Sequence, residues 1–181
     1  MENSKKSPHE IEDTNQSDIL IGLLSDTHVP TKNSSIDEKV LEIFQRKGID
    51  YLVHCGDFVS QNAYDQLKSL VPSERFIAVR GNMDYADLFL QQLPETRSFS
   101  ILRQNIFLTH GSGAPFGIIK RLHQNFDLTP YNIVFFGHTH QAMDKEKDGK
   151  YYINPGRCKP GGTIALVKIT TKDVSVEIVR V

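Results

Sequence analysis

The stretch ILIGLLSDTH, residues 19–28, places two strong metal ligands, Asp26 and His28, just after a short apolar run. The stretch IVFFGHTH, residues 133–140, repeats this arrangement with His138 and His140. Short apolar runs bounded by polar residues are typical of buried strands. If the chain stays extended, residues i and i+2 project to the same side, about 6–7 Å apart. This spacing suits a pair of metal ions about 3.5–4 Å apart.

Three further apolar runs end in the same way, with polar side chains and a glycine where the run stops. The groups that follow them are Gly56-Asp57, Gly81-Asn82-Met83-Asp84 and His110-Gly111. In open α/β sheets, ligands bind in the crevice outside the carboxyl ends of the strands, and glycine lets the backbone approach a ligand closely. Five strand ends with this chemistry predict one site assembled from distant parts of the chain.

These motifs resemble, in number and order, the signature of the calcineurin-like metallophosphoesterases. The matching segments are Asp26-x-His28, Gly56-Asp57, Gly81-Asn82-x-Asp84, His110-Gly111 and Gly137-His138-x-His140. The later Asn154-Pro155-Gly156 is similar to the small subgroup that includes archaeal and bacterial phosphodiesterases and the retromer scaffold subunit. The resemblance extends from residue 19 to residue 181.

The resemblance implies a binuclear metal site and allots its ligands residue by residue. One divalent ion would be held by Asp26, His28, Asp57 and His140, and the other by Asp57, Asn82, His110 and His138, with Asp57 as the bridge. A hydroxide bound at this site would attack the phosphate ester, and Asp57, Asn82 and His110 would take part in catalysis. All donors are nitrogen or oxygen atoms. Mn, the family's frequent choice, is the expected metal, with Ni, Fe, Zn, Co and Mg as alternatives.

Three positions depart from the family pattern. Larger members carry a histidine, thought to protonate the leaving group, where this chain has Met83. Ser112 stands where many relatives have another histidine, and Arg157 stands where many have serine. Ser112 and Arg157 are candidate substrate-binding residues, and the planar guanidinium of Arg157 could reach phosphate. For Arg157, a position at the surface or at the rim of the site is the favoured interpretation.

The arrangement of apolar runs predicts an α/β fold. Strands expected at residues 19–24, 51–55 and 76–80 alternate with helices, so this half should form a parallel sheet with helical crossovers. Further strands are expected at residues 98–103, 105–109, 131–136, 163–169 and 174–181, with a hairpin turn at Asp148-Gly149. We therefore expect two sheets packed face to face with helices outside. The resemblance implies the same arrangement, a four-layer αββα sandwich of two mixed β-sheets.

Three helices have recognisable boundaries. Ser35-x-x-Glu38 is a capping box for the first helix, which Gly48 ends. Ser60 caps the second, and Pro72 ends it at about residue 70. The third is expected over residues 115–123, with proline near its first turn.

The composition predicts one domain, at residues 19–181, after a flexible tail at residues 1–18. Lys and Arg number 21 and Asp and Glu 22, without a basic run, so nucleic acid is not indicated as a partner. No apolar run approaches the roughly 18 residues of a membrane span, and the polar first residues do not resemble a secretory signal. Cys55 and Cys158, the two cysteines, do not form a disulfide framework, which favours a cytoplasmic setting.

Each candidate ligand also has a simpler structural interpretation. Asp26 and Asp84 could cap helices or turns, Asn82 could be a turn residue, and the histidines could be structural. Four histidines at separate strand ends favour the metal site, whereas Asp84 is expected to support it rather than bind metal. The predicted function is a metal-dependent phosphodiesterase acting on a small-molecule phosphate ester. A phosphomonoesterase and a catalytically weak protein-binding scaffold are the alternatives, and pairing of exposed sheet edges would allow a homo-oligomer.

Overall fold

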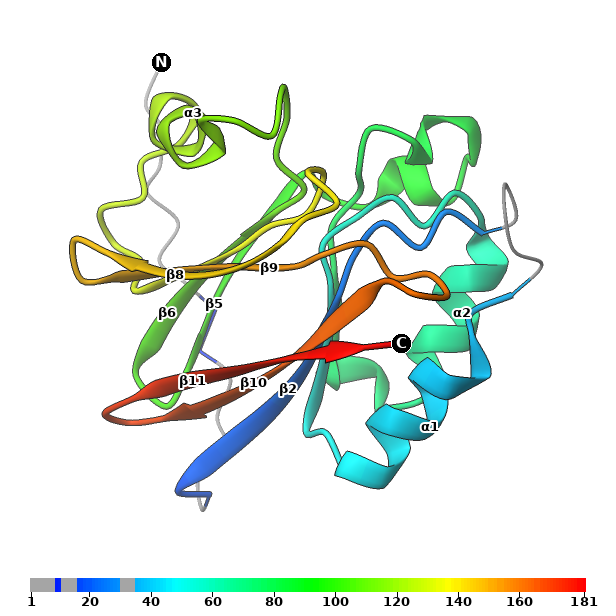
Figure 1. The fold of residues 1–181 in the computed structure, drawn as a ribbon, viewed down its shortest axis with the longest axis horizontal. Helices are drawn as coiled ribbons and strands as arrows, with labels where there is room; N and C mark the ends of the chain where they lie inside the picture. Colours follow the sequence, from blue (N-terminus) through cyan, green and yellow to red (C-terminus); the bar gives the residue numbers. More distant parts are fainter. Residues whose placement is uncertain (1–8, 11–15, 30–34) are drawn as a thin grey trace.

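Two mixed β-sheets form the centre of the computed structural model, which describes residues 9–10, 16–29 and 35–181 (Figure 1). The five-stranded sheet has the order β11-β10-β2-β3-β4. Its strands are β2 (Asp18–Leu24), β3 (Tyr51–His54), β4 (Phe76–Ala78), β10 (Thr163–Thr170) and β11 (Val174–Arg180). β2, β3 and β4 pair in parallel, as the alternation of strands and helices predicted. β10 pairs antiparallel with both β2 and β11.

The second sheet has six strands in the order β1-β5-β6-β7-β9-β8. They are β1 (His9–Glu10), β5 (Thr96–Ile101), β6 (Gln104–Thr109), β7 (Ile133–Phe135), β8 (Ala142–Lys147) and β9 (Lys150–Pro155). β6, β7 and β9 pair in parallel, whereas β5 is antiparallel to β6 and β8 is antiparallel to β9. β1 lies within the segment expected to be a tail and pairs with β5. The expected hairpin turn at Asp148-Gly149 joins β8 to β9, with positive φ at both residues.

Helices cover the outer faces of both sheets and complete the predicted four-layer αββα sandwich (Figure 1). α1 (Glu38–Lys47) and α2 (Gln61–Lys68) pack against the five-stranded sheet, and α3 (Ile118–Asn125) packs against the other. Three short 3-10 helices, η1 (Ser73–Arg75), η2 (Asp84–Ala86) and η3 (Leu90–Gln92), lie in connecting segments.

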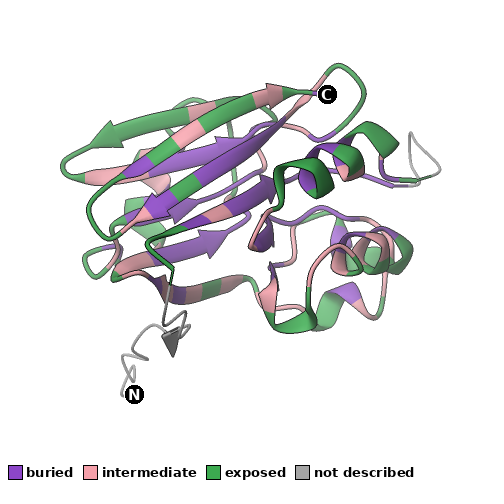
Figure 2. Cartoon of the chain, turned by 90° about the horizontal axis from the view of Figure 1, so that it is seen from below, coloured by how far each residue is buried: buried purple, intermediate pink, exposed green. Residues whose placement is uncertain are grey.

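The central strands are apolar on both faces because both of their faces are covered. Ile19, Ile21 and Leu23 of β2 belong to the core between the two sheets. Leu20 and Leu24, which alternate with them, belong to the core beneath α1 and α2. Figure 2 shows this burial along the central strands, with exposed residues on the outer sides of the helices.

Two helix starts differ from the expectation. α1 is capped by Asp37, whose carboxylate accepts a hydrogen bond from the Lys39 backbone N–H at 3.0 Å, and not by Ser35. α3 begins at Ile118 and not at Pro115, because Gly117 has a left-handed backbone with φ of 77° that a helix cannot include. The start of α2 at its cap Ser60 agrees with the sequence.

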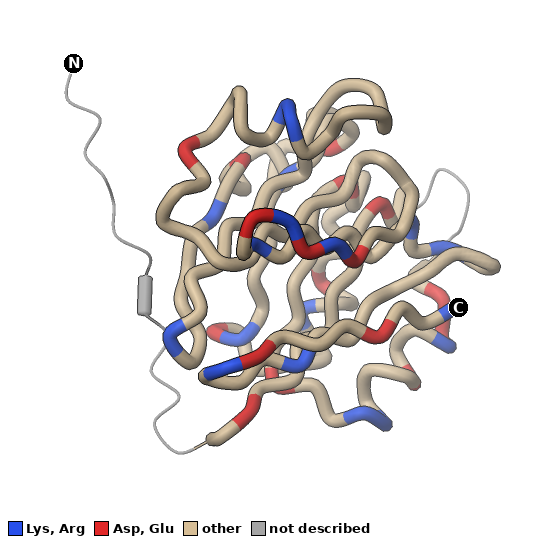
Figure 3. The backbone as a smooth tube through the Cα atoms, turned by 60° about the vertical axis from the view of Figure 1, so that its left-hand side comes forward, with Lys and Arg blue, Asp and Glu red and all other residues tan. Residues whose placement is uncertain are grey.

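Charged residues of both signs are interspersed along the chain, as the tube in Figure 3 shows. On β8, for example, Lys145, Glu146 and Lys147 follow one another. The formal net charge of the whole chain is −1. Among the described residues, no helix has the length and apolar character needed to cross a membrane.

Candidate metal centre

All seven candidate ligands follow the carboxyl ends of parallel strands and lie at one end of the two sheets. Asp26 and His28 follow β2, Asp57 follows β3, Asn82 follows β4, His110 follows β6, and His138 and His140 follow β7. A continuous series of close side-chain contacts joins them, with distances between 2.9 and 3.8 Å. The fold therefore brings together every residue that the sequence proposed as a ligand.

The first group in this series is centred on Asp26, whose side chain is fully buried. Its Oδ1 atom lies 3.2 Å from His140 Nε2 and 3.8 Å from His28 Nε2. Within the described part of the chain, this buried oxygen has no hydrogen bond of acceptable geometry. A buried carboxylate oxygen without a hydrogen bond is costly unless a cation compensates its charge. These three side chains offer donor atoms close enough together to hold one metal ion.

Asp57 lies between this group and the next. Its Oδ2 atom is 3.6 Å from His28 Nε2 and 3.4 Å from His110 Nε2. Its Oδ1 atom accepts a hydrogen bond from the Met83 backbone N–H at 2.7 Å. One oxygen is thus fixed by the backbone, which leaves the other directed at histidines of both groups. Asp57 therefore links the Asp26 group to the histidine of the next group.

The second group is centred on the Asn82 side-chain oxygen. This oxygen lies 3.2 Å from His110 Nε2 and 2.9 Å from His138 Nδ1. The other ring nitrogen of each histidine lies against a backbone carbonyl, His110 Nδ1 at 2.8 Å from Cys55 O and His138 Nε2 at 2.9 Å from Gly113 O. Histidines that bind metals commonly donate their second nitrogen to such a carbonyl.

These carbonyl contacts determine which histidine nitrogens are free to bind a cation. A carbonyl oxygen only accepts, so His110 Nδ1 and His138 Nε2 must carry the protons. In the neutral rings, the remaining nitrogens then direct lone pairs toward the oxygen atoms of Asp57 and Asn82. Lone pairs that face one another repel unless a proton or a metal cation lies between them. The donor set therefore fits a divalent metal.

The backbone of the site is unusually left-handed. Five candidate ligands have positive φ, namely Asp26 (56°), His28 (50°), Asp57 (62°), His138 (66°) and His140 (59°). The expectation that both ligand pairs lie on extended chain is therefore wrong. Such conformations cost about 1–3 kcal/mol each for residues other than glycine and are concentrated at functional sites. Hydrogen bonds between loops support them here, including Asp26 N–H to Gly56 O at 3.0 Å and His28 N–H to Asp57 O at 3.1 Å.

Asp84 supports the site from beneath, as expected, through its fully buried carboxylate. It accepts hydrogen bonds from the backbone N–H groups of Asp57 at 2.9 Å, Val59 at 2.8 Å and Gly81 at 2.7 Å. These bonds join the loop after β3 to the loop after β4. The two loops also pass so closely that a Cβ atom at Gly81 would collide with the Asp57 carboxylate.

Asn154 has a supporting role that the sequence did not reveal, although its Asn-Pro-Gly motif marked the position. Its buried amide group donates to Gly137 O at 2.8 Å and to Thr139 Oγ1 at 3.1 Å, while its oxygen accepts from Gly156 N–H at 2.8 Å. It therefore holds the turn between the two histidines that follow β7. The supporting carbonyls of Cys55 and Gly113 have no signal in the sequence, because every residue carries such a group.

The electrostatics favour charged carboxylates in the centre. Burial alone raises the pKa of Asp26, but the contacts with His140 and His28 outweigh it and hold this pKa far below its usual value. For Asp57, burial is likewise outweighed by His110, and the pKa is lowered. Burial lowers the pKa of His110, but the Asp57 carboxylate reverses this effect and the net pKa is raised. Each of these directions reflects the attraction between carboxylate and imidazole.

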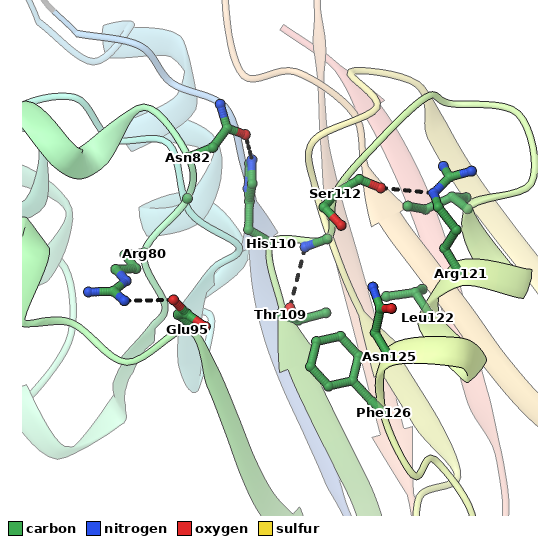
Figure 4. Close-up of a pocket in the computed structure, with 13 residues that line it drawn as sticks. Arg80, Asn82, Glu95, Thr109, His110, Ser112, Arg121, Leu122, Asn125 and Phe126 are labelled. Carbon is green, nitrogen blue, oxygen red and sulfur yellow. Dashed lines mark hydrogen bonds and ion pairs between the residues drawn. The ribbon is translucent and has the colours of Figure 1, made fainter.

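The two residues proposed to contact substrate have different positions. Ser112 lines a cavity together with Asn82 and His110 (Figure 4). Arg157 is not among the residues that line this cavity. Its Nε atom is buried and, among described residues, has no hydrogen-bond partner. A contact between Arg157 and substrate therefore remains a prediction.

Comparison with known protein families places this geometry in context. A family model described as the calcineurin-like phosphoesterase superfamily domain matches residues 19–172. The chain belongs to this superfamily. The match covers all seven candidate ligands. Together, the superfamily and the buried Asp–His cluster indicate binding of divalent metal.

Three members of the superfamily illustrate the similarity. A probable metallophosphoesterase of Methanothermobacter thermautotrophicus is 33% identical over 138 residues, which are 76% of this chain and 76% of that protein. A phosphodiesterase of Methanocaldococcus jannaschii is 30% identical over 148 residues, covering 76% of this chain and 83% of that protein. The crystal structure of Vps29 from Entamoeba histolytica complexed with Zn²⁺ is 27% identical, with a TM-score of 0.72, and covers 90% of this chain and 98% of that chain.

Proposed function

We propose that the chain is a metal-dependent phosphoesterase, and specifically a phosphodiesterase, that hydrolyses a small-molecule phosphate ester. The main support is the series of contacts through Asp26, Asp57 and Asn82, which gathers four histidines around two groups of donor atoms. Similar proteins named phosphodiesterase and metallophosphoesterase add support from the same superfamily.

We assign the ligands of two divalent ions as follows. Asp26, His28, Asp57 and His140 would hold one ion, and Asp57, Asn82, His110 and His138 the other, in line with the side-chain contacts within each set. Asp57 suits the bridging position because its Oδ2 atom faces a histidine of each group. Mn²⁺ is our expected metal, and the Zn²⁺ bound by the Entamoeba histolytica protein makes Zn²⁺ the first alternative.

The proposed ligands leave the site attractive to an anionic ester. Asp26 and Asp57 contribute two negative charges, against four positive charges from two divalent ions. When bound, the ions would supply Lewis acidity toward the phosphoryl oxygens and a hydroxide nucleophile at neutral pH. Asn82 and His110 line the cavity beside the centre and so would orient the ester there.

In this chain, the position next to Asn82 lacks a side chain that could protonate the leaving group. Met83 stands next to Asn82, and its thioether cannot donate a proton. Its backbone N–H is already engaged by Asp57. The proposed reaction therefore favours esters whose leaving groups depart without protonation, such as aryl phosphodiesters.

A comparison of two chromogenic esters tests the proposal. The protein is loaded with Mn²⁺, and hydrolysis of bis(p-nitrophenyl) phosphate is compared with that of p-nitrophenyl phosphate, before and after chelation. Preferential hydrolysis of the diester that chelation abolishes is expected. Preference for the monoester would instead identify a phosphomonoesterase. Equal turnover after complete removal of metal would contradict a metal-dependent mechanism.

A catalytically weak protein-binding scaffold is the second candidate function. The similarity to Vps29 of Entamoeba histolytica over 90% of the chain favours it. The two candidates differ in one measurement, because a scaffold would bind metal and hydrolyse neither ester.

We place the protein in the cytoplasm in either case. Cys55 and Cys158 are both free thiols, which suits a reducing compartment.

A further inference from the structure

A cavity of about 260 Å³ opens beside the candidate metal centre (Figure 4). Asn82 and His110 form its boundary with the centre. The opposite wall comes from α3 and the residue after it, through Leu122, Asn125 and Phe126. Any group attached to a phosphoryl group at the metal centre would therefore have this cavity within reach.

Arg80, on the β4 side of the cavity, is paired with Glu95. Its guanidinium lies 2.7 Å from Glu95 Oε1 and donates a second hydrogen bond to Gln91 O at 2.6 Å. In Figure 4 this ion pair forms one side of the cavity. Because this cation already has a carboxylate partner and a carbonyl partner, its attraction for a phosphate in the cavity is reduced.

Arg121, on the α3 side, is engaged by backbone carbonyls. It donates to Ser112 O at 3.0 Å, to Phe116 O at 2.8 Å and to Ala114 O. These bonds hold the loop before α3, which carries Ser112 into the cavity wall. The charge of Arg121 thus serves to fix the loop. Among the described residues that line the cavity, Arg80 and Arg121 are the only Lys or Arg side chains, and both already have hydrogen-bond partners.

Apolar side chains from α3 and the residue after it form much of the remaining cavity wall, and polar side chains lie at its rim. Ile118 and Leu122 are buried at 3% and 2% exposure, and the Phe126 ring packs against Phe107 with ring centroids 5.0 Å apart. Asn125 and Ser112, both exposed, add amide and hydroxyl groups at the rim. Apolar walls with a few polar groups are typical of sites for uncharged organic groups.

We infer that this cavity seats an uncharged, ring-shaped organic group of the phosphate ester. The inference rests on the proposed function, because it places the phosphoryl group at the metal centre. The cavity is smaller than the roughly 300–1,000 Å³ of sites that enclose a whole small ligand, so it takes one group of the ester and not the entire molecule. It thereby selects ring-bearing diesters over those with small alkyl groups.

Two anions of equal charge and different organic groups test this selection. Diphenyl phosphate and dimethyl phosphate are measured as competitive inhibitors of bis(p-nitrophenyl) phosphate hydrolysis by the metal-loaded protein. The wild-type protein should bind diphenyl phosphate at least about tenfold more tightly, because only its ring fills the apolar cavity. Asn125→Trp fills the cavity from its rim and should reduce this preference to about threefold or less.

Gln124→Trp provides the matched control, because Gln124 is the exposed neighbour on α3 and does not line the cavity. It should keep the wild-type preference. Asn125→Leu, a smaller substitution compatible with a helix, should give an intermediate preference and serves if the tryptophan variant is poorly folded. Metal content is measured in each variant, so that a damaged centre is recognised.

The inference is overturned if wild-type protein shows no preference between the two anions. It is also overturned if Asn125→Trp and Asn125→Leu retain the full preference. Failure of the proposed function would look different, since no ester would be hydrolysed. In that case, calorimetric titration of the same two anions into metal-loaded wild-type and variant protein makes the same comparison. Loss of preference in the Asn125 variants alone then supports the cavity assignment, and an unchanged preference refutes it.

Discussion

The carboxylate of Asp84 accepts a hydrogen bond from the backbone N–H of Asp57 at 2.9 Å, and so fixes the loop that carries the central candidate ligand. The same carboxylate holds Val59 and Gly81. Burial raises the pKa of Asp84, against the opposing effect of these N–H groups. Asp84 therefore connects two loops of the site through its two carboxylate oxygens, both of which accept hydrogen bonds from backbone N–H groups.

Asp84→Asn should damage this connection. The amide replaces one acceptor oxygen with an NH₂ group that faces a backbone N–H, so at least one buried donor loses its partner. We expect the free energy of unfolding to fall by about 1–3 kcal/mol, measured by urea denaturation, and metal affinity to fall with it. Asp87→Asn is the control, because Asp87 accepts N–H groups of Gln61, Phe89 and Leu90 and is not among the candidate ligands. An equal loss of metal affinity in both variants would contradict a specific role for Asp84.

Gly81→Ala should disrupt the centre sterically. The added methyl group would meet the Asp57 carboxylate and the Asp57 backbone nitrogen, so one of the two loops must move. We expect metal content, measured by elemental analysis, to fall at least about tenfold, because ligand positions must hold to about 0.5 Å. Gly149→Ala is the control, since a Cβ there meets nothing within 4 Å although φ is positive at 71°. Normal metal binding by Gly81→Ala would show that the close approach of the loops is unnecessary.

Asp57→Asn tests the bridge by removing charge with little change of shape. Asparagine tolerates the left-handed backbone at this position, and its side-chain oxygen can still accept from the Met83 N–H. Because the missing charge faces histidines of both groups, occupancy of both metal positions should decrease together in elemental analysis. Asp144→Asn, on exposed β8, should bind metal like wild type. Retention of the full metal content by Asp57→Asn would refute the bridging assignment.

Much of the fold could be predicted because the apolar runs in the sequence coincide with strands that pair in the sheets. The apolar run before Asp26 is a strand, and so is each run before Asp57, Asn82 and His110. Parallel pairing then places the carboxyl ends of β2, β3 and β4 side by side. The residue types at these ends were therefore enough to predict that the candidate ligands lie together.

The left-handed backbone of the ligand loops could not be predicted in this way. Asp26 and His28 adopt positive φ while bonding to Gly56 and Asp57, about thirty residues away in the chain. The residues next to Asp26 and His28 in the sequence give no indication of hydrogen-bond partners so far away in the chain. The start of α3 was missed for a similar reason, because the left-handed Gly117 precedes the helix and the side chain of Arg121, four residues later, binds the Phe116 carbonyl before it. Likewise, the cavity is lined by residues far apart in the chain, including Asn82 after β4 and Asn125 of α3.

The rate of hydrolysis should depend steeply on the leaving group. Met83 has a side chain that cannot protonate a departing alkoxide, and the residue is 37% exposed. In a series of phosphodiesters, we expect rates to fall sharply as the pKa of the leaving alcohol rises. Met83→His should restore a proton donor and raise the rates of alkyl esters by about 10²-fold or more, with little effect on aryl esters. A flat dependence in the wild-type protein would indicate that another group already protonates the leaving oxygen.

The buried ring of His54 should lower the stability of the metal-free protein in mild acid. This ring is fully buried, stacks on Phe58 with centroids 3.5 Å apart, and accepts the Gly56 N–H at 3.0 Å. Burial lowers the pKa of His54 from its ordinary value of 6.5 to about 3, so the folded state holds the ring neutral. The unfolded chain binds a proton below about pH 6.5, and the folded chain does so only near pH 3. Stability from His54 is therefore complete above pH 6.5 and is lost as the pH falls toward 3.

Between pH 7 and pH 5 this loss amounts to about 2 kcal/mol, measured by urea denaturation in the presence of a chelator. His110 acts in the opposite direction, because a raised pKa stabilises the folded state in acid. The effect of His54 is therefore read from the difference between wild type and His54→Gln, whose stability should change less over the same range. His123→Gln, which alters a histidine bonded to Tyr152 on the other side of the sandwich, should keep the wild-type slope. Parallel slopes for wild type and His54→Gln would mean that the buried ring does not resist protonation.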